Sequence, residues 1–190
     1  MTPDAVRYTV TIAAPASHLA RISARFPVAG LGDTVDVAMP AWCPGSYMIR
    51  DYARFVRGLV VHGDDGVARP AVKRDKQTWR IERRGARTLE VSYQVYGHDL
   101  SVRTNHIDGS HAFIHGPATF VHVEALRDRR CLLAVVPPEA DGGAAPWSIA
   151  TGLARAAPSE WPDDPGGATC FAAADLDELY DGPLHLGGGE

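Results

Sequence analysis

Histidines give this sequence its most visible potential for chemistry, because it has eight, and four lie in H-I-D-G-S-H-A-F-I-H-G-P-A-T-F-V-H, residues 106–122. His111 and His115 are four residues apart, a spacing that places two zinc ligands on one face of a helix. The surrounding residues predict strand instead, in which four residues span roughly 13 Å. Two ligands that each lie about 2 Å from one zinc ion cannot both reach it across that span. We therefore expect surface or hydrogen-bonded histidines, and no metal site in this chain.

Other catalytic signatures are absent from the sequence. It contains no H-E-x-x-H, G-x-S-x-G or C-x-x-C pattern and no glycine-rich phosphate loop. A nucleophilic thiol at Cys43 would need a neighbouring base, and the sequence does not identify one. Arg103 begins a polar cluster with Thr104 and Asn105, which suits a structural ion pair or a contact with a ligand. We expect no catalytic residue in this chain.

The irregular stretch Pro40–Phe55 reads P-A-W-C-P-G-S-Y-M-I-R-D-Y-A-R-F and has neither the period of a strand nor that of a helix. Its Pro44-Gly45 pair predicts a turn. Three rings with large apolar areas to bury indicate an ordered loop laid over a β scaffold, and these are Trp42, Tyr47 and Tyr52. From the residues alone, two interpretations stay open: the rings plug one end of a sandwich, or the loop contacts a ligand.

The scaffold for this loop is predicted by short alternating segments. Apolar and polar residues alternate in 6–12, 20–26, 35–39, 79–81 and 89–95, and the apolar runs 56–61 and 131–136 also fit strands. We further expect at best an edge strand at 67–73, which contains Pro70, strands at 100–102, 111–115, 120–123 and 147–153, and a helix at 173–180. About ten short strands with little helix predict an all-β fold. It is either an antiparallel β-sandwich or an elongated twisted sheet with one short C-terminal helix.

Bulk properties narrow the class of protein. A length of 190 residues suits one domain, large enough to fold without a disulfide or a metal. The net charge of −4 argues against nucleic-acid and anionic membrane partners, and no apolar run is long enough to span a bilayer. The N-terminus has no signal-peptide pattern, and three widely spaced cysteines form no disulfide framework. We expect a cytoplasmic protein.

Several segments together resemble the N-terminal domain of the glycyl aminopeptidase family of zinc metallopeptidases. They are P-A-W-C-P-G-S-Y-M-I-R-D-Y-A-R-F, K-R-D-K-Q-T-W-R-I, Y-Q-V-Y-G-H-D-L-S-V-R-T, W-S-I-A-T-G-L and D-L-D-E-L-Y-D-G-P-L-H-L-G. They occur in the family's order across nearly the whole chain, and the first is the most specific. Members are about three times longer, with a thermolysin-like catalytic domain that carries H-E-x-x-H and a PDZ-like domain after it.

The resemblance implies a β-rich N-terminal domain over 1–183 and a linker over 184–190, leading towards a catalytic domain that this chain lacks. Zinc is expected in that missing domain and no cofactor in this chain. The expected partners are the catalytic domain in cis and peptide substrates, and the isolated fragment is expected to self-associate through its docking patch. The parent protein is expected to be an aminopeptidase that prefers small N-terminal residues such as glycine.

By analogy with related two-domain aminopeptidases, the substrate-facing candidates are Ser46, Tyr47, Arg50, Arg103, Asn105, His115 and Gly116. One departure is that His115 stands where the family is expected to have asparagine. Two alternatives remain beside this hypothesis. One is a stand-alone β-sandwich module that binds peptides or glycans on the rings of the loop. The other is a small metal-dependent hydrolase built on the histidine-rich segment.

Overall fold

The computed structural model describes residues 4–140, 146–157, 160–161 and 167–188. It confirms the all-β fold, with 45% of the chain in strands that form three sheets, and one short helix near the C-terminus. Short turns of 3-10 helix connect the strands in the described residues: η1 (Pro15–Ser17), η2 (Tyr52–Phe55), η3 (Gly116–Ala118) and η4 (Glu124–Leu126). No helix among the described residues is long and apolar enough to cross a membrane.

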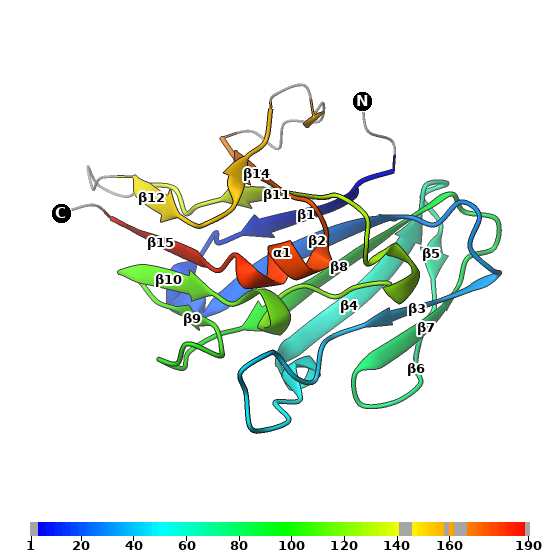
Figure 1. The fold of residues 1–190 in the computed structure, drawn as a ribbon, viewed down its shortest axis with the longest axis horizontal. Coiled ribbons are helices and arrows are strands. Elements are labelled where there is room, and N and C mark those ends of the chain that lie inside the picture. The colour runs from blue at the N-terminus through cyan, green and yellow to red at the C-terminus, as the bar shows by residue number, and fades with distance from the viewer. Residues whose placement is uncertain (1–3, 141–145, 158–159, 162–166, 189–190) are drawn as a thin grey trace.

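One twisted sheet of eight strands forms the back layer of the molecule (Figure 1). Its spatial order is β13 (Ala154–Arg155), β14 (Thr169–Ala173), β11 (Cys131–Val136), β1 (Val6–Thr11), β2 (Leu19–Pro27), β8 (Thr88–Tyr96), β4 (Val56–Gly63) and β5 (Ala68–Arg69). Neighbouring strands are antiparallel except β1 and β11, which pair in parallel with Val6 opposite Cys131. This pair ties the two halves of the chain into one sheet.

Two smaller sheets and the helix pack in front of the large sheet (Figure 1). The four-stranded sheet has the order β12 (Trp147–Ala150), β15 (Leu184–Gly188), β10 (His111–Ile114) and β9 (His106–Ile107). The three-stranded sheet has the order β3 (Thr34–Ala38), β7 (Thr78–Glu82) and β6 (Ala71–Lys73). One buried apolar cluster contains side chains from all three sheets, so the molecule has one main core.

Alternation along the strands decides which side chains enter that core. On β2, Ile22 and Phe26 are buried against the smaller sheets, while Arg21 faces the opposite side. The ring of Tyr8 on β1 contacts Phe26 and Phe120, and its hydroxyl donates to the Val121 carbonyl at 3.0 Å. The buried phenol is therefore satisfied, and the long connection after β10 is held against the large sheet.

Three of the predicted strands are wrong in detail. The segment 67–73 is split at Pro70 into β5 and β6, which belong to different sheets, because proline cannot donate to a ladder. The segment 100–102 is an exposed loop rather than a strand. The segment 120–123 is irregular, with a single β-bridge between Ala38 and His122, and Phe120 is buried there by the rings of the core.

The prediction of a linker over 184–190 is also wrong for its described part. Leu184–Gly188 is β15, which pairs with both β10 and β12. Its two leucines, Leu184 and Leu186, are buried because alternation points both of them into the core. Residues 189–190 lie outside the described residues. The predicted helix is confirmed in shorter form as α1 (Leu176–Asp181), whose N-cap Asp175 accepts from the backbone N–H of Glu178 at 2.9 Å.

Candidate functional site

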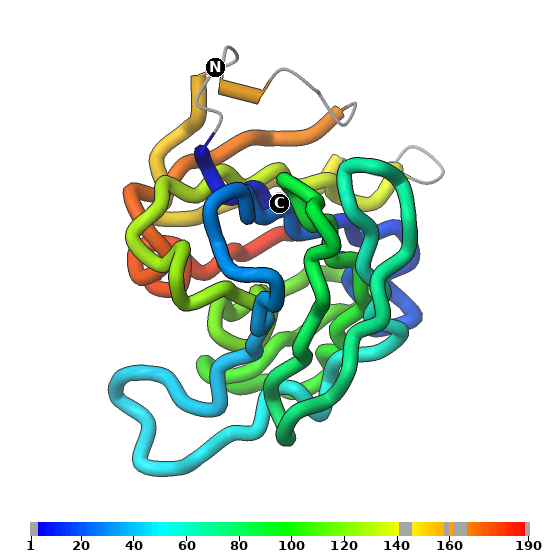
Figure 2. The backbone as a smooth tube through the Cα atoms, turned by 90° about the vertical axis from the view of Figure 1, so that its right-hand side faces the viewer, coloured from blue at the N-terminus to red at the C-terminus, as the bar shows by residue number. Residues whose placement is uncertain are grey.

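The loop Pro40–Phe55 extends from one end of the molecule, where it is the light blue to cyan segment at the lower left of Figure 2. Its predicted turn is present, because the backbone N–H of Ser46 donates to the Cys43 carbonyl and Gly45 has a φ of +79°. The Arg50 backbone N–H donates to the Ala41 carbonyl at 2.7 Å and closes the loop. These bonds make the segment an ordered loop.

Ser46 organises the inside of the loop. Its hydroxyl donates to the Met48 carbonyl at 3.0 Å and accepts from the Arg50 Nε at 3.1 Å. The indole N–H of Trp42 donates to the Ser46 carbonyl at 2.7 Å. Ser46 is itself buried, so among the substrate-facing candidates it positions Arg50. Ser46 and Arg50, which the sequence proposes together, are thus in direct contact, and their role towards a substrate stays a prediction.

Tyr52 anchors the base of the loop in the core. Its side chain is buried, its hydroxyl lies 3.4 Å from the Cys43 Sγ, and its ring centroid lies 6.0 Å from that of His115. Burial, and next the contact with Cys43, raise the pKa of Tyr52, so the phenol is neutral at pH 7. The polar neighbour of Cys43 is thus a weakly acidic phenol, which does not supply the base that a nucleophilic thiol needs.

The tip of the loop is apolar and exposed. Tyr47 is fully exposed, and Met48 and Ile49 are 62% and 65% exposed. A second exposed apolar segment contains Leu100 and Val102, and Arg103 connects it to the loop by donating from Nη2 to the Gly45 carbonyl at 3.4 Å. We call these five apolar residues the apolar rim. Sequence reasoning missed four of them, although consecutive apolar residues after a Pro-Gly turn were a readable signal.

Asn105, His115 and Gly116 are placed differently from the other candidates. Asn105 is buried, and its Oδ1 accepts from the His115 backbone N–H at 2.8 Å and from the Thr119 hydroxyl at 3.1 Å. Gly116 is buried against α1, where a Cβ would lie 2.7 Å from the Tyr180 Cα. The contacts of these residues are internal. Tyr47, Arg50 and Arg103 therefore remain the candidates for contact with a substrate, and Ser46 holds Arg50 in place.

His115 lies between the loop and the internally bonded residues Asn105 and Gly116. Its ring packs on Tyr52 at the base of the loop, and its Nε2 is buried without a hydrogen-bond partner among the described residues. Burial lowers the pKa of His115 to about 4, so the imidazole is neutral at pH 7. A neutral ring packed edge-on against a phenol packs as an apolar group would. His115 is thus part of the floor under the loop.

The rings do not form the stacking platform that a carbohydrate- or peptide-binding module would present. Tyr52 is buried, whereas Tyr47 is exposed and Trp42 is 47% exposed with its indole N–H bonded inside the loop. A platform needs rings side by side in solvent, and burial removes one of the three. The hypothesis of a stand-alone binding module therefore lacks one of its three proposed binding rings, because Tyr52 is buried.

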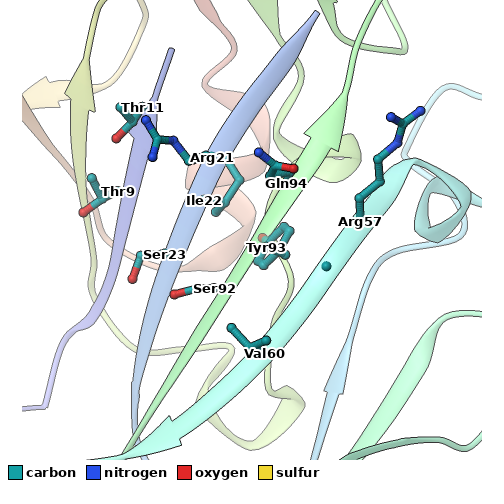
Figure 3. A pocket seen from close by; sticks show the side chains of 11 residues that line it. Thr9, Thr11, Arg21, Ile22, Ser23, Arg57, Val60, Ser92, Tyr93 and Gln94 are labelled. Atoms are coloured by element: carbon teal, nitrogen blue, oxygen red, sulfur yellow. The ribbon is translucent and has the colours of Figure 1, made fainter. Parts of the chain in front are cut away.

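A separate hollow lies away from the loop, on the outer face of the large sheet (Figure 3). It has a volume of about 470 Å³ and lies beside a bulge in β4 between Arg57 and Val60. Its lining has no carboxylate, imidazole or thiol and consists of Thr9, Thr11, Arg21, Ile22, Ser23, Arg57, Gly58, Val60, Ser92, Tyr93 and Gln94. No predicted site residue lies in it, and its side chains offer no general acid or base.

Comparisons with known proteins agree with this architecture. Residues 7–188 match the family described as Peptidase M61 N-terminal domain. A crystal structure of an aminopeptidase N family protein from Idiomarina loihiensis is similar, with a TM-score of 0.81 and 30% identity, over 96% of this chain and 29% of that chain. A search of the curated proteins finds no match.

A more distant likeness shows the fold alone. A mutant of the M1 zinc metallopeptidase from Deinococcus radiodurans has a TM-score of 0.57 and 11% identity, over 97% of this chain and 41% of that chain. The same protein bound to a Tyr-Ser-Ala substrate gives a TM-score of 0.56. This chain thus spans less than half of each of these structures. By its family match over nearly its whole length, the chain belongs to the Peptidase M61 N-terminal domain family.

Proposed function

We propose that this chain is the non-catalytic N-terminal β domain of a zinc aminopeptidase of the glycyl aminopeptidase type. In this proposal it packs on the catalytic domain and forms one wall of the cleft that receives peptide N-termini. The observation that carries the proposal is the apolar rim, Tyr47, Met48, Ile49, Leu100 and Val102, exposed on an ordered loop and its neighbour. The family match and the larger size of the similar structures support a partner domain in the same chain.

The apolar rim is costly to expose and therefore suits a protein partner. Burying one large apolar side chain stabilises a contact by roughly 1.5–3 kcal/mol. The loop that carries Met48 and Ile49 is closed by backbone bonds and by the Ser46 hydroxyl, so docking it costs little conformational entropy. A preformed loop with an apolar tip is typical of a surface that packs against a fixed neighbour.

Cations beside the apolar rim give the cleft its polarity. Arg50 is held by Ser46, and Arg103 is held by the Gly45 carbonyl, so both guanidinium groups lie at the border of the apolar rim. Arginine binds carboxylates in a bidentate manner. In the proposed enzyme these two residues contact acidic groups of the peptide or of the catalytic domain. The zinc chemistry belongs to the catalytic domain, since this sequence has no H-E-x-x-H.

The experiment that tests this proposal uses the full-length protein that carries this chain. We expect Ile49→Ser and Arg50→Ala to lower kcat/KM for glycyl-p-nitroanilide at least about tenfold, because they remove an apolar and a cationic contact at the domain border. The matched control is Val72→Ser, which is 62% exposed, close to Ile49 at 65%, but lies on strand β6 and not in the loop. Equal activity of all three variants and wild type contradicts the proposal.

The isolated chain provides a second test. It should show no hydrolysis of glycyl-p-nitroanilide with added zinc, and it should self-associate at high concentration through the apolar rim. Ile49→Ser should reduce this association in sedimentation experiments, while Val72→Ser should not. Robust turnover by the isolated chain would refute the claim that the chemistry resides in the other domain.

A further inference from the structure

Five of the eight histidines form a row that crosses the edge of the four-stranded sheet. Consecutive ring centroids in the order His18, His98, His106, His111 and His185 lie 3.8, 5.4, 4.8 and 5.8 Å apart. Three of the rings belong to three adjacent strands of that sheet, β9, β10 and β15. Strand pairing therefore brings together imidazoles that are far apart along the sequence.

A carboxylate lies beside the middle of this row. Asp108 occupies the turn between β9 and β10, and its Oδ2 accepts from the His106 Nε2 at 2.9 Å. Its Oδ1 lies 3.5 Å from the His111 Nδ1. One potential ligand atom from each of these three residues lies within 4.8 Å of the others, and among the described residues no other such group of histidine, cysteine and acidic side chains is found.

The turn holds the Asp108 carboxylate in a fixed orientation. Its Oδ1 accepts from the Ser110 hydroxyl and backbone N–H at 2.7 Å each and from the His111 backbone N–H at 3.0 Å. Its Oδ2 points at the imidazole of His106. Such bonds from surrounding groups orient metal ligands in proteins.

His106 is prepared for a ligand role by its burial. Its side chain is only 6% exposed, and its Nδ1 is buried with no hydrogen-bond partner among the described residues. The ring is fixed between its neighbours, and its Nε2 makes one hydrogen bond, to the carboxylate. When a cation binds Nε2, the ring proton moves to Nδ1, the single hydrogen bond to the carboxylate is displaced, and the cation meets an oxygen that already faces it.

The distances are close to those of a zinc site. Ligand atoms of a tetrahedral zinc ion, each about 2.0–2.1 Å from the metal, lie roughly 3.3 Å apart. The Asp108 Oδ2 lies 2.9 Å from the His106 Nε2, and the Asp108 Oδ1 lies 3.5 Å from the His111 Nδ1, so each imidazole faces one of the two carboxylate oxygens at close to that separation. The two imidazole rings are stacked, so the His111 ring must turn until the metal lies near its plane. Its 34% exposure leaves room for this turn, which exchanges the 2.9 Å contact with the Ser110 hydroxyl for the metal.

The fourth ligand position opens into a pocket. A hollow of about 280 Å³ lies over the cluster and is lined by Leu100, Ser101, Val102, His106, His111, Phe113 and His185. It is large enough for water, which completes the coordination of a metal held by three protein ligands. The apolar side chains Leu100 and Val102 at its border belong to the apolar rim, which places the cluster directly beside that surface.

We propose that His106, Asp108 and His111 bind one divalent transition-metal ion of the zinc class, with water in the fourth position. Two imidazoles and one carboxylate form the ligand set that such ions prefer. The bound ion fixes the β9–β10 turn and the neighbouring segment 100–103, and thereby the Arg103 contact to the loop. The ligands of the proposed site all belong to this chain, so the chain alone is enough to test it.

The test measures binding of Zn²⁺ alone to the untagged 190-residue chain by isothermal titration calorimetry. We expect one equivalent to bind, and we expect His111→Gln to weaken binding at least about tenfold. The matched control is His62→Gln, which removes an exposed histidine on β4, and it should bind as wild type does. Co²⁺ should give the intense visible bands of a four-coordinate ion in wild type and not in His111→Gln.

Folding of the variants is checked by their thermal unfolding without metal. His111 is partly exposed, so His111→Gln should unfold within a few degrees of wild type, and added Zn²⁺ should raise the midpoint of wild type only. Asp108→Asn provides a second variant with the same expected loss of binding. Absence of stoichiometric binding by wild type overturns the proposal, and so does equal binding by wild type, His111→Gln and Asp108→Asn.

Discussion

The loop Pro40–Phe55 and the row of five histidines lie on neighbouring parts of the molecule but differ in the side chains that they expose. The loop exposes apolar side chains, Tyr47 to Ile49, on a backbone closed by internal bonds. The row gathers imidazoles and a carboxylate, with His106 almost fully buried. The loop is polar inside and apolar outside, whereas the row places polar rings side by side at the edge of a sheet.

This difference separates two kinds of recognition. An exposed apolar tip is stabilised only by a partner large enough to cover it, which indicates a protein surface. Clustered nitrogen and oxygen ligands within a few ångströms of one another suit a small ion instead. The proposed docking surface and the proposed ion site thus lie beside each other, with Arg103 contacting the loop from the segment between them.

Two tyrosines of the loop should differ most in their effect on stability. Tyr52→Ala removes a buried ring beneath the loop, and we expect it to lower the free energy of unfolding by about 3–5 kcal/mol. Tyr47→Ala removes an exposed ring and should change that free energy by less than about 0.5 kcal/mol. Urea unfolding of the isolated chain checks both. Similar losses for the two variants would show that Tyr52 does not anchor the loop in the core.

Substitutions of two glycines near the histidines should differ in their effect on stability. Gly116→Ala places a Cβ 2.7 Å from the Tyr180 Cα and 2.9 Å from its carbonyl oxygen, so we expect a loss of about 1–3 kcal/mol. Gly109 in the turn after Asp108 has open space around its Cα, and Gly109→Ala should cost less than about 0.5 kcal/mol. Thermal unfolding distinguishes them, and an unperturbed Gly116→Ala would mean that α1 is free to move away.

Acidification should lower the stability of the fold through protonation of His115, whose ring packs against Tyr52 beneath the loop. Burial lowers its pKa from 6.5 to about 4, so between these values the unfolded chain binds more protons than the folded chain. Stability is therefore full above pH 6.5 and is lost as the pH falls towards 4, by about 1–2 kcal/mol. His115→Asn should lose less stability over this range in urea unfolding at pH 7 and pH 4.5. Parallel profiles for the two proteins would contradict this account.

The smallest expected effect concerns the inside of the loop. Ser46→Ala removes a buried hydroxyl that bonds to Met48 and Arg50, and we expect a loss of about 1 kcal/mol. Ser148→Ala removes an exposed hydroxyl with one bond to the Gly187 carbonyl and should cost less than about 0.5 kcal/mol. Chemical unfolding of both variants makes the comparison. A Ser46→Ala protein as stable as wild type would mean that Ser46 does not hold the loop.

Local patterns in the sequence predicted much of the fold, because alternation on strands such as β2 and β8 records which face is buried. The parallel pairing of β1 with β11 was not predictable, since it joins residues 6–11 to 131–136 and leaves no local trace. The glycines near the C-terminus suggested a linker, yet the two leucines of β15 decided the outcome. In this segment, burial of the two leucines outweighs the low strand propensity of glycine.

The sequence likewise predicted some groups of neighbouring polar residues and missed others. Ser46 and Arg50 were found together because both lie in one specific motif. The group of His106, Asp108 and His111 was missed because attention to spacing along a strand favoured His111 and His115, whereas the ligand atoms converge across a hairpin. An H-x-D-x-x-H pattern around a turn was the signal that could have indicated it. Strand pairing, not linear spacing, brings these groups together.

Amide hydrogen exchange tests the docking proposal most directly. Exchange at residues 46–50 and 100–103 should be compared between the isolated chain and the full-length protein that contains it. Packing of the apolar rim on the catalytic domain predicts slower exchange of these two segments in the full-length protein, with no change in Ala71–Lys73 on β6. Equal exchange of residues 46–50 in both proteins would contradict the claim that this loop faces the catalytic domain.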